Sequence, residues 1–304
     1  MNNSKFDIVI YHQNCPDGIG GLWCAHLYKK DNFQKIGIPA GKDPYGNFVN
    51  KSLLFIDVCP SYKFLIETSK IAKSITVLDH HKSAYDMYLS NKNELDQVAN
   101  IKMHFNMNLS GCQIGWDYFF PESKRPWFID YIGDCDLWKF ELSNSKEINC
   151  SLEFNKFIDS ENLNKLDELQ KYLDEDIMNL AKEGEMIFSV KNHIMKNQLQ
   201  YSEERKMIID DKCYRVQVGT ISTDMKSAFG NMLATKKFDD GTDPDFGIIW
   251  NYWAEKDEWY ISMRGTDNSP DLSVISKIFG GGGHPKASGF TVKENPFYKL
   301  IVLS

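Results

Sequence analysis

The chain has 304 residues, of which 42% are hydrophobic and 25% charged, and its formal net charge is −7. This composition predicts a folded protein large enough for two domains, and the acidic balance argues against long duplex nucleic acid as a partner, because such a partner needs many phosphates neutralised. The start MNNSKFDIVIYH lacks the apolar run of a signal peptide or membrane span, and the seven cysteines include no CxxC pair, so we expect a cytoplasmic protein with free thiols and no membrane partner.

The first half alternates strand-like runs with helical stretches. Residues 6–12 (FDIVIYH), 53–58 (LLFIDV) and 74–81 (SITVLDHH) are rich in Ile, Val, Leu and Phe, which predicts buried strands. Between the last two, residues 61–73 place apolar side chains on one helical face, with Ser61 as the N-cap. Strand, helix and strand in this order predict a parallel α/β domain, which we place at residues 1–155.

The remaining chain predicts a connector and a second domain. Leucine and isoleucine recur every three or four residues from Leu163 to Leu180, which predicts a helix that continues past Gly184, within a helical connector at residues 156–204. After it, YRVQVGTI, DFGIIWNYW and EWYISMRG read as strands, the last two joined in a hairpin. We therefore expect a smaller C-terminal α/β domain with a mixed sheet at residues 205–304.

Polar residues gather where the predicted strands of the first half end. They are His12 and Asp17, then Asp57, then Asp79, His80 and His81. Parallel strands end at one edge of a sheet, so these groups should lie together, and their carboxylates would repel one another without cations. Carboxylate and imidazole donors suit Mn²⁺, Mg²⁺, Fe or Co better than structural zinc, and a pair of such ions suits phosphate-ester hydrolysis.

Two features near these strand ends leave alternatives open. Gly18, Gly20 and Gly21 follow the first strand, and they allow a tight turn, the close packing of the following helix on the sheet, or both. A fourth motif, YIGDCDLW, follows an aromatic helical stretch and adds Asp134 and Asp136 to the candidate ligands.

The motifs YHQNCPDGIGG, LLFIDVCPS, VLDHHKS and YIGDCDLW, followed by FGGGGHPKASGF, resemble those of the DHH phosphoesterase superfamily. The last motif resembles the signature of the DHH-associated C-terminal domain, so the resemblance extends over nearly the whole chain. Among the superfamily's members, the RecJ-like and nano-RNase-like proteins are the expected relatives. The resemblance implies a two-metal site, most consistent with Mn²⁺, with Mg²⁺ or Co²⁺ as alternatives.

By this resemblance, each matched residue takes a role. Asp57 would bridge the two metals, and His80 would ligate the metal shared with Asp17. Asp134 would complete the shell of that metal, with Asp136 as the alternative because the spacing fits either. The other metal would be held by His12, and Asp79 and His81 would act as catalytic residues that support the histidine ligand and the bound phosphate.

One position departs from the family pattern. Cys15 stands where the first of two aspartates is expected, because the chain reads CPDG instead of a D-x-D-G pattern. A thiolate there could ligate a softer metal, or the metal position beside His12 could be weak or empty. The alternative that Cys15 is only a small buried residue at a crowded strand end also stays open.

The C-terminal motif predicts an anion-binding corner. A helix should start at Ser269 and Pro270 and end in the glycine run. By the resemblance, this corner would clamp phosphate and nucleotide opposite the metal site, across the cleft between domains, through Arg264, Gly282, Gly283 and His284. Glycines let backbone N–H groups approach such an anion closely, and an arginine fork matches it.

These observations predict a hydrolase acting on phosphoric esters, with exonuclease-like or phosphodiesterase activity. It would hydrolyse a short oligonucleotide or a small nucleotide phosphoester by metal-activated water. The alternative is a catalytically impaired protein of the same fold that binds nucleotides or nucleic acid, with Cys15 as the cause of the impairment.

Overall fold

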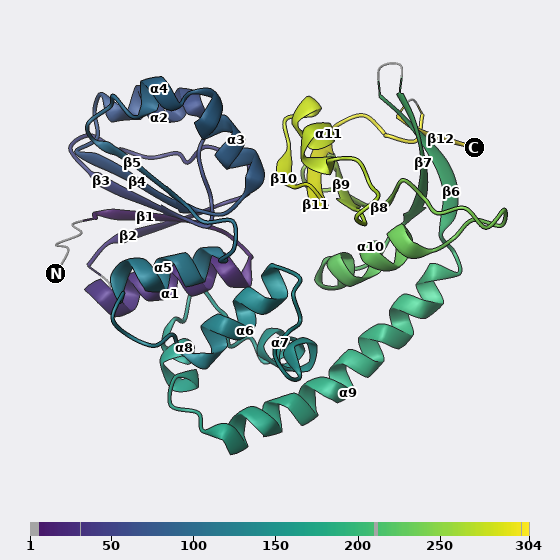
Figure 1. Cartoon of the computed structure of the whole chain (residues 1–304), viewed down its shortest axis with the longest axis horizontal. Helices are drawn as coiled ribbons and strands as arrows, with labels where there is room; N and C mark the ends of the chain where they lie inside the picture. Colours follow the sequence, from purple (N-terminus) through teal and green to yellow (C-terminus); the bar gives the residue numbers. More distant parts are fainter. Residues whose placement is uncertain (1–5, 31, 210–211, 299, 304) are drawn as a thin grey trace. The chain divides into compact units, whose positions relative to one another are not determined.

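The structure is a computed structural model, which describes residues 6–30, 32–209, 212–298 and 300–303. Its internal contacts divide the chain once, into the units Met1–Phe188 and Ser189–Ser304 (Figure 1). Both units combine helices with a β-sheet, which confirms the α/β class, the parallel first sheet and the mixed second sheet. The boundaries expected near residues 155 and 204 stay predictions.

The N-terminal unit contains a five-stranded parallel sheet. Its order is β2 (Gln34–Ile38), β1 (Ile8–His12), β3 (Ser52–Ile56), β4 (Ser74–Asp79) and β5 (Ile101–Phe105). The sequence predicted the three central strands, because each is a continuous apolar run. It did not predict β2 and β5, which are edge strands whose exposed lysines interrupt the apolar pattern.

Helices cover both faces of this sheet. On one face, α1 (Pro16–Lys29), α5 (Gly111–Phe119) and α6 (Trp127–Asp136) share a core with alternate residues of β1, β3 and β4. On the other face, α2 (Tyr62–Ser69), α3 (Lys82–Ser90) and α4 (Lys92–Leu95) pack on the intervening residues. The predicted cap is present, since the Ser61 side chain accepts a hydrogen bond from the Phe64 N–H.

The helix predicted from Leu163 to Leu180 is two helices, α8 (Asn164–Leu169) and α9 (Asp174–Leu199), which follow α7 (Ser145–Phe154). Local hydrogen bonds explain the break, because the Trp127 indole donates to the Leu169 carbonyl and the Asp176 carboxylate accepts from the Leu173 N–H. The expected continuation past Gly184 is confirmed. None of the described helices combines the length and apolarity that a bilayer crossing requires.

The C-terminal unit contains a seven-stranded mixed sheet. Its order is β10 (Gly282–His284), β11 (Ala287–Val292), β9 (Glu258–Arg264), β8 (Phe246–Trp253), β7 (Lys212–Gly219), β6 (Glu203–Ile209) and β12 (Ile301–Leu303). Among the described strands of this sheet, only β7 and β8 pair in parallel. The β8–β9 hairpin was predicted from its alternating aromatic residues and polar turn, and the structure confirms it.

Two helices cover opposite faces of this sheet, and the one-turn 3-10 helix η1 (Thr223–Met225) precedes the first of them. Helix α10 (Lys226–Thr235) packs on Ile249, whereas α11 (Leu272–Ile278) packs on its neighbour Ile248. Successive residues of a strand point to opposite faces, so the two helices lie on different sides. Helix α11 starts later than predicted, because its N-cap is Asp271, whose carboxylate accepts from the Ser273 N–H.

Candidate metal centre

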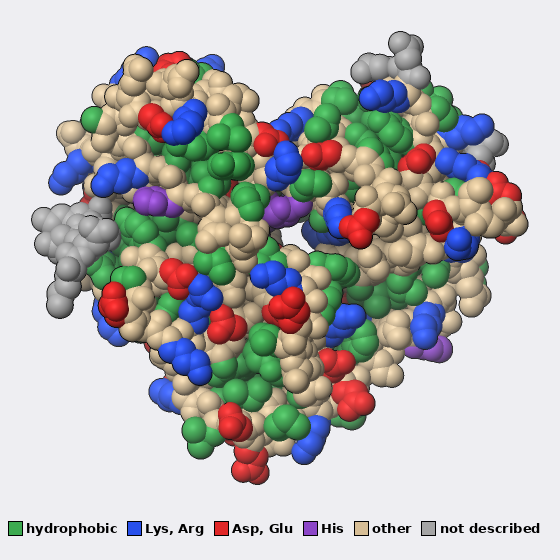
Figure 2. All heavy atoms as spheres, in the orientation of Figure 1, with side chains coloured by type: hydrophobic (Ala, Val, Ile, Leu, Met, Phe, Trp, Pro, Cys, Tyr) green, Lys and Arg blue, Asp and Glu red, His purple; other side chains and the backbone are tan. Residues whose placement is uncertain are grey.

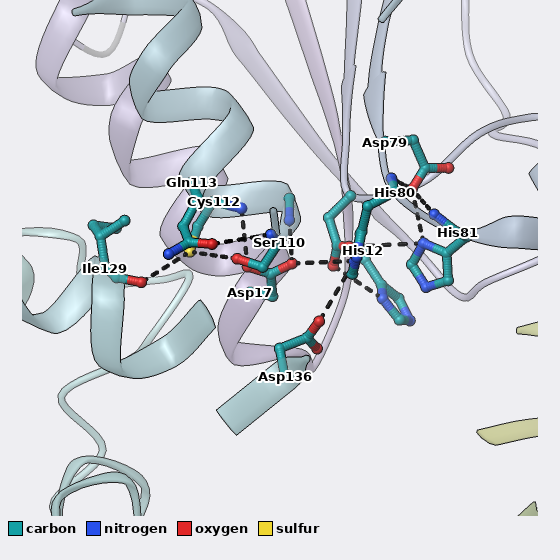
Figure 3. A network of polar contacts seen from close by, with 12 residues as sticks. His12, Asp17, Asp79, His80, His81, Ser110, Cys112, Gln113, Ile129 and Asp136 are labelled. Atoms are coloured by element: carbon teal, nitrogen blue, oxygen red, sulfur yellow. Dashed lines mark hydrogen bonds and ion pairs between the residues drawn. The ribbon is translucent and has the colours of Figure 1, made fainter. Parts of the chain in front are cut away.

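The carboxyl ends of β1, β3 and β4 bring the predicted polar residues together (Figure 3). His12 ends β1, and Asp57 follows β3 with φ +59°, a left-handed conformation that ends the strand. The Asp57 carboxylate contacts two imidazoles, His12 Nδ1 at 3.2 Å from Oδ2 and His80 Nε2 at 3.1 Å from Oδ1. Asp57, at the end of β3, therefore links all three strand ends.

The pKa of Asp57 reflects these contacts. Burial by itself would raise the pKa, but hydrogen bonds from His12 and His80 outweigh it and hold the pKa well below its usual range. Gly111 makes the arrangement possible, because a β-carbon at this position would lie 2.4 Å from the Asp57 β-carbon. No sequence motif indicates this requirement, since the two residues lie far apart along the chain.

His80 is the point on which the carboxylates converge. Its Nε2 lies 3.1 Å from Asp57 Oδ1 and 3.5 Å from both Asp17 Oδ2 and Asp136 Oδ2, and its side chain is 1% exposed. Burial lowers the pKa of His80, but the carboxylates, Asp57 above all, raise it to about 10. Burial and the neighbouring carboxylates raise the pKa of Asp17 to about 8. Both shifts favour the protonated forms of these two groups.

Asp17 is positioned by two helices. It lies in the first turn of α1, and its carboxylate accepts hydrogen bonds from the Gly111 N–H at 2.5 Å and the Cys112 N–H at 2.9 Å. These amides open α5, where a helix N-terminus favours negative charge. Gly111 and Cys112 are site residues that the motifs did not reveal.

The glycines after the first strand lie inside α1, and the turn before the helix uses Asn14, with φ +55°. A β-carbon at Gly18 would lie 2.2 Å from the His12 carbonyl oxygen, and one at Gly21 would lie 2.3 Å from Ile56 Cγ2. These contacts confirm that the glycines allow close packing of the helix on the sheet.

Asp79 organises the DHH motif. Its Oδ1 accepts from the backbone N–H groups of His80 and His81 and lies 2.7 Å from His81 Nδ1. Burial lowers the pKa of His81, but Asp79 outweighs this effect and raises it. Asp79 Oδ2 is buried and has no hydrogen-bond partner among the described residues.

Asp134 and Asp136 have different partners. The Asp134 carboxylate accepts from the N–H groups of Glu141 at 2.9 Å and Leu142 at 3.4 Å, so it holds the loop after α6. Asp136 instead lies beside His80, and its side chain is 26% exposed. Residues two apart on a helix point in widely different directions, and the geometry therefore selects Asp136 over Asp134 as the carboxylate near the histidine.

Cys15 lies with His12 and Asp57 in a group whose potential donor atoms are all within 4.8 Å of one another. Asp17, His80 and Asp136 form a second such group, and Asp57, Asp79, His80 and His81 form a third. Burial, followed by the charges of Asp57 and Asp136, raises the pKa of Cys15 well above its usual value. The Cys15 thiol is therefore protonated in the metal-free protein.

The predicted anion-binding residues lie in the C-terminal unit. Arg264 ends β9, where Nη2 donates to Ser227 Oγ and Nη1 to the Met263 carbonyl, both at 2.9 Å. Burial lowers its pKa to about 10, and among the described residues no carboxylate forms an ion pair with it. Gly282, Gly283 and His284 form β10, and Gly283 has φ +134°, which favours glycine. Ser227 was not predicted.

Comparisons with known proteins give one strong match in sequence. No family model matches the chain. Three solved structures with low likeness, the pGpG-specific phosphodiesterase PggH of Vibrio cholerae, an exopolyphosphatase-related protein of Bacteroides fragilis and CDC45 of Entamoeba histolytica, each have a TM-score of 0.44. PggH is 12% identical, with 95% of this chain and 93% of PggH covered. The exopolyphosphatase-related protein is 13% identical, with 96% of this chain and 88% of that protein covered. CDC45 is 9% identical, with 96% of this chain and 93% of CDC45 covered.

An uncharacterized protein of Acanthamoeba polyphaga mimivirus, R106, is 30% identical over 311 aligned positions, which cover 95% of this chain and 68% of the viral protein. A match of this extent shows common descent over nearly the whole chain. The chain belongs to the same protein family as this mimivirus protein.

Proposed function

We propose that the chain is a divalent-metal-dependent phosphoesterase that hydrolyses a short oligonucleotide or a small nucleotide phosphoester. The observation that carries this proposal is the convergence of Asp17, Asp57 and Asp136 on His80 Nε2 at the carboxyl edge of the parallel sheet. Buried carboxylates gathered in this way are costly unless cations lie among them.

The donor set fits a pair of hard divalent cations, with Mn²⁺ preferred and Mg²⁺ or Co²⁺ as alternatives. Asp17, Asp57, Asp136, His80 and His12 would hold the ions, and Cys15 is a further donor in reach of His12 and Asp57. The buried Asp79 Oδ2, which lacks a hydrogen-bond partner among the described residues, also suits a site that a cation completes. When bound, such ions would lower the pKa of water and neutralise phosphoryl oxygens.

In the proposed reaction, His81 would transfer a proton, and Asp79 and Asp57 would position the histidines. Asp79 Oδ1 contacts His81 Nδ1, which fixes the proton on that nitrogen and leaves Nε2 to exchange protons with the substrate. Asp79 raises the pKa of His81 and so favours the protonated ring, whose Nε2 would protonate the leaving oxygen when the P–O bond breaks. Asp57 keeps His12 and His80 in place.

Arg264 and β10 would hold the phosphate of the substrate. The guanidinium is oriented by Ser227 and has no carboxylate partner among the described residues, so an anion would complete its hydrogen bonds. On the face drawn in Figure 2, basic side chains are mixed with acidic ones, so this view of the described residues shows no continuous basic track. The Arg264 guanidinium supports an anionic substrate, and the mixed surface charge supports a short one.

The experiment is hydrolysis of a panel by the full-length chain after chelation and reloading with Mn²⁺, Mg²⁺ or Co²⁺. The panel contains a 5′-phosphorylated dinucleotide, a five-nucleotide RNA, a cyclic dinucleotide, a 3′,5′-bisphosphonucleoside and pyrophosphate. We expect cleavage of one class, its loss in chelator, and its loss in Asp57→Asn with the fold retained. Activity of Asp57→Asn equal to that of the parent would refute the metal assignment.

One observation favours a second candidate function. Cys15 occupies the place of an expected carboxylate and its raised pKa keeps the thiol neutral, which weakens the donor set beside His12. A protein that binds nucleotides without hydrolysing them would then result. Tight binding of the same panel, with no turnover in any metal, would support this candidate.

A further inference from the structure

One face of the C-terminal sheet carries a cationic row at its edge. In antiparallel strands, residues directly opposite each other share a face. His284 is opposite Ala287, and Ala287 is opposite Arg264, so these three side chains form a row across β10, β11 and β9. In this row only the small Ala287 side chain stands between the imidazole and the guanidinium.

The next row on the same face is almost without side chains. It consists of Gly282, Gly289 and Ser262, which are opposite one another on the same three strands. A β-carbon at Gly289 would lie 2.7 Å from the Ile261 carbonyl oxygen, so a larger residue does not fit there without a shift. A rise of about 3.4 Å per residue places this smooth row ~7 Å from the cationic row.

An aromatic pair follows on the same face. Tyr260 lies two residues beyond Ser262 on β9, about 14 Å from the cationic row, and Trp253 ends the neighbouring strand β8. Their ring centroids are 5.6 Å apart, and Trp253 is 41% exposed. The ammonium of Lys256 lies 4.0 Å from the centroid of the Trp253 ring, which adds a positive charge beside the pair.

We propose that Tyr260, supported by Trp253, stacks on a base of a single-stranded oligonucleotide whose phosphate lies between Arg264 and His284. This inference rests on the proposed function, because it names the substrate class of that site: at least two linked nucleotides. A mononucleotide with its phosphate at Arg264 would leave its base over the glycine row, whereas the base of the next nucleotide would reach Tyr260. Inorganic polyphosphate would make no use of the aromatic pair.

The chain offers a matched control on the opposite face. Tyr252 precedes Trp253 on β8 and is 46% exposed, which is close to the 41% of Trp253. Its ring packs against Trp259 at 5.0 Å, and because successive residues of a strand point to opposite faces it lies on the other face of the sheet from Trp253. Removal of Tyr252 therefore removes an exposed aromatic ring from the same hairpin without changing the proposed stacking surface.

The test measures binding to the full-length, metal-free protein in chelator, where hydrolysis does not interfere. The probes are a 5′-phosphorylated dinucleotide with 2-aminopurine as its second base and the same molecule without that base. We expect the parent protein to bind the complete dinucleotide about tenfold more tightly, corresponding to ~1.4 kcal/mol, with quenched 2-aminopurine emission. Tyr260→Ala and Trp253→Ala should reduce this preference, whereas Tyr260→Phe and Tyr252→Ala should keep it.

The result that overturns the inference is Tyr260→Ala binding the complete dinucleotide as tightly as the parent protein, or Tyr252→Ala weakening binding as much as Tyr260→Ala. Hydrolysis of bis(4-nitrophenyl) phosphate, which has no base, separates this failure from that of the proposed function. Metal-dependent hydrolysis without any base preference overturns only the stacking. A base preference in a protein that hydrolyses no phosphoester in any metal overturns only the proposed function.

Discussion

Two carboxylates of α6, separated by one residue, meet different partners. The Asp134 carboxylate accepts hydrogen bonds from the N–H groups of Glu141 and Leu142, whereas Asp136 Oδ2 lies 3.5 Å from His80 Nε2. The sequence motif contains both residues. Their spacing indicates that the two side chains point in different directions on a helix, but it does not indicate which one faces the sheet. The three-dimensional placement of α6 supplies the missing information.

Asp136→Asn and Asp134→Asn should therefore fail in different ways. Asp136→Asn removes a charged donor beside His80, so we expect Mn²⁺ affinity to fall by about 10- to 100-fold with little change in melting temperature. Asp134→Asn leaves a backbone N–H without its acceptor, so we expect a loss of ~1–2 kcal/mol in stability with metal affinity largely kept. Calorimetric titration and thermal unfolding measure the two effects, and the reverse pattern would assign the ligand to Asp134.

Metal binding should release protons at pH 7. The pKa of Asp17 is raised to about 8 and that of His80 to about 10, so both groups hold protons at pH 7 in the metal-free protein. A cation binds their deprotonated forms, so affinity should increase as the pH rises from 6 towards these pKa values. Titration in buffers with different ionisation enthalpies should give different observed enthalpies; identical enthalpies in all buffers would contradict the prediction.

At the scale of elements, the site depends on how tightly helices approach the sheet. Helix α5 begins against Asp57 and donates its first amides to Asp17, and α1 approaches β1 and β3 through glycines. The three central strands could be predicted because their apolar runs are unbroken. The contact between α5 and Asp17 could not, because it joins residues that no local pattern connects.

Gly111→Ala tests this close approach, and Gly115→Ala on the same helix is its control. A β-carbon at Gly111 would lie 2.4 Å from the Asp57 β-carbon, so we expect ~1–3 kcal/mol of destabilisation and loss of metal-dependent hydrolysis. At Gly115 the nearest atom would lie at 3.6 Å, an ordinary contact, and alanine favours helices. Gly115→Ala should keep activity with equal or greater stability. Full activity in Gly111→Ala would show that α5 can retreat from Asp57 without harm.

For the whole molecule, each unit has its own hydrophobic core. The proposed ligands all belong to the N-terminal unit, so a metal ion should stabilise that unit directly. We expect calorimetry to resolve two unfolding transitions, of which Mn²⁺ shifts one. At 100 times the dissociation constant, the shift corresponds to ~2.7 kcal/mol. An equal shift of both transitions in the full chain would show that the units unfold as one.

The sequence motifs predicted most of the candidate site but less of the fold around it. His12, Asp17, Asp57 and His80 could be found because strand ends are readable from apolar runs. The break between α8 and α9 could not, because the leucine pattern continues across it and only side-chain hydrogen bonds from Trp127 and Asp176 interrupt the helix.

The spread of the donors along the chain sets an order of events during synthesis. Four separate segments, from His12 to Asp136, must be present before the carboxylates can surround His80. A nascent chain on the ribosome can therefore assemble the complete centre only after α6 has emerged. Until then, β1, β3 and β4 can form while the polar residues at their ends remain open to water.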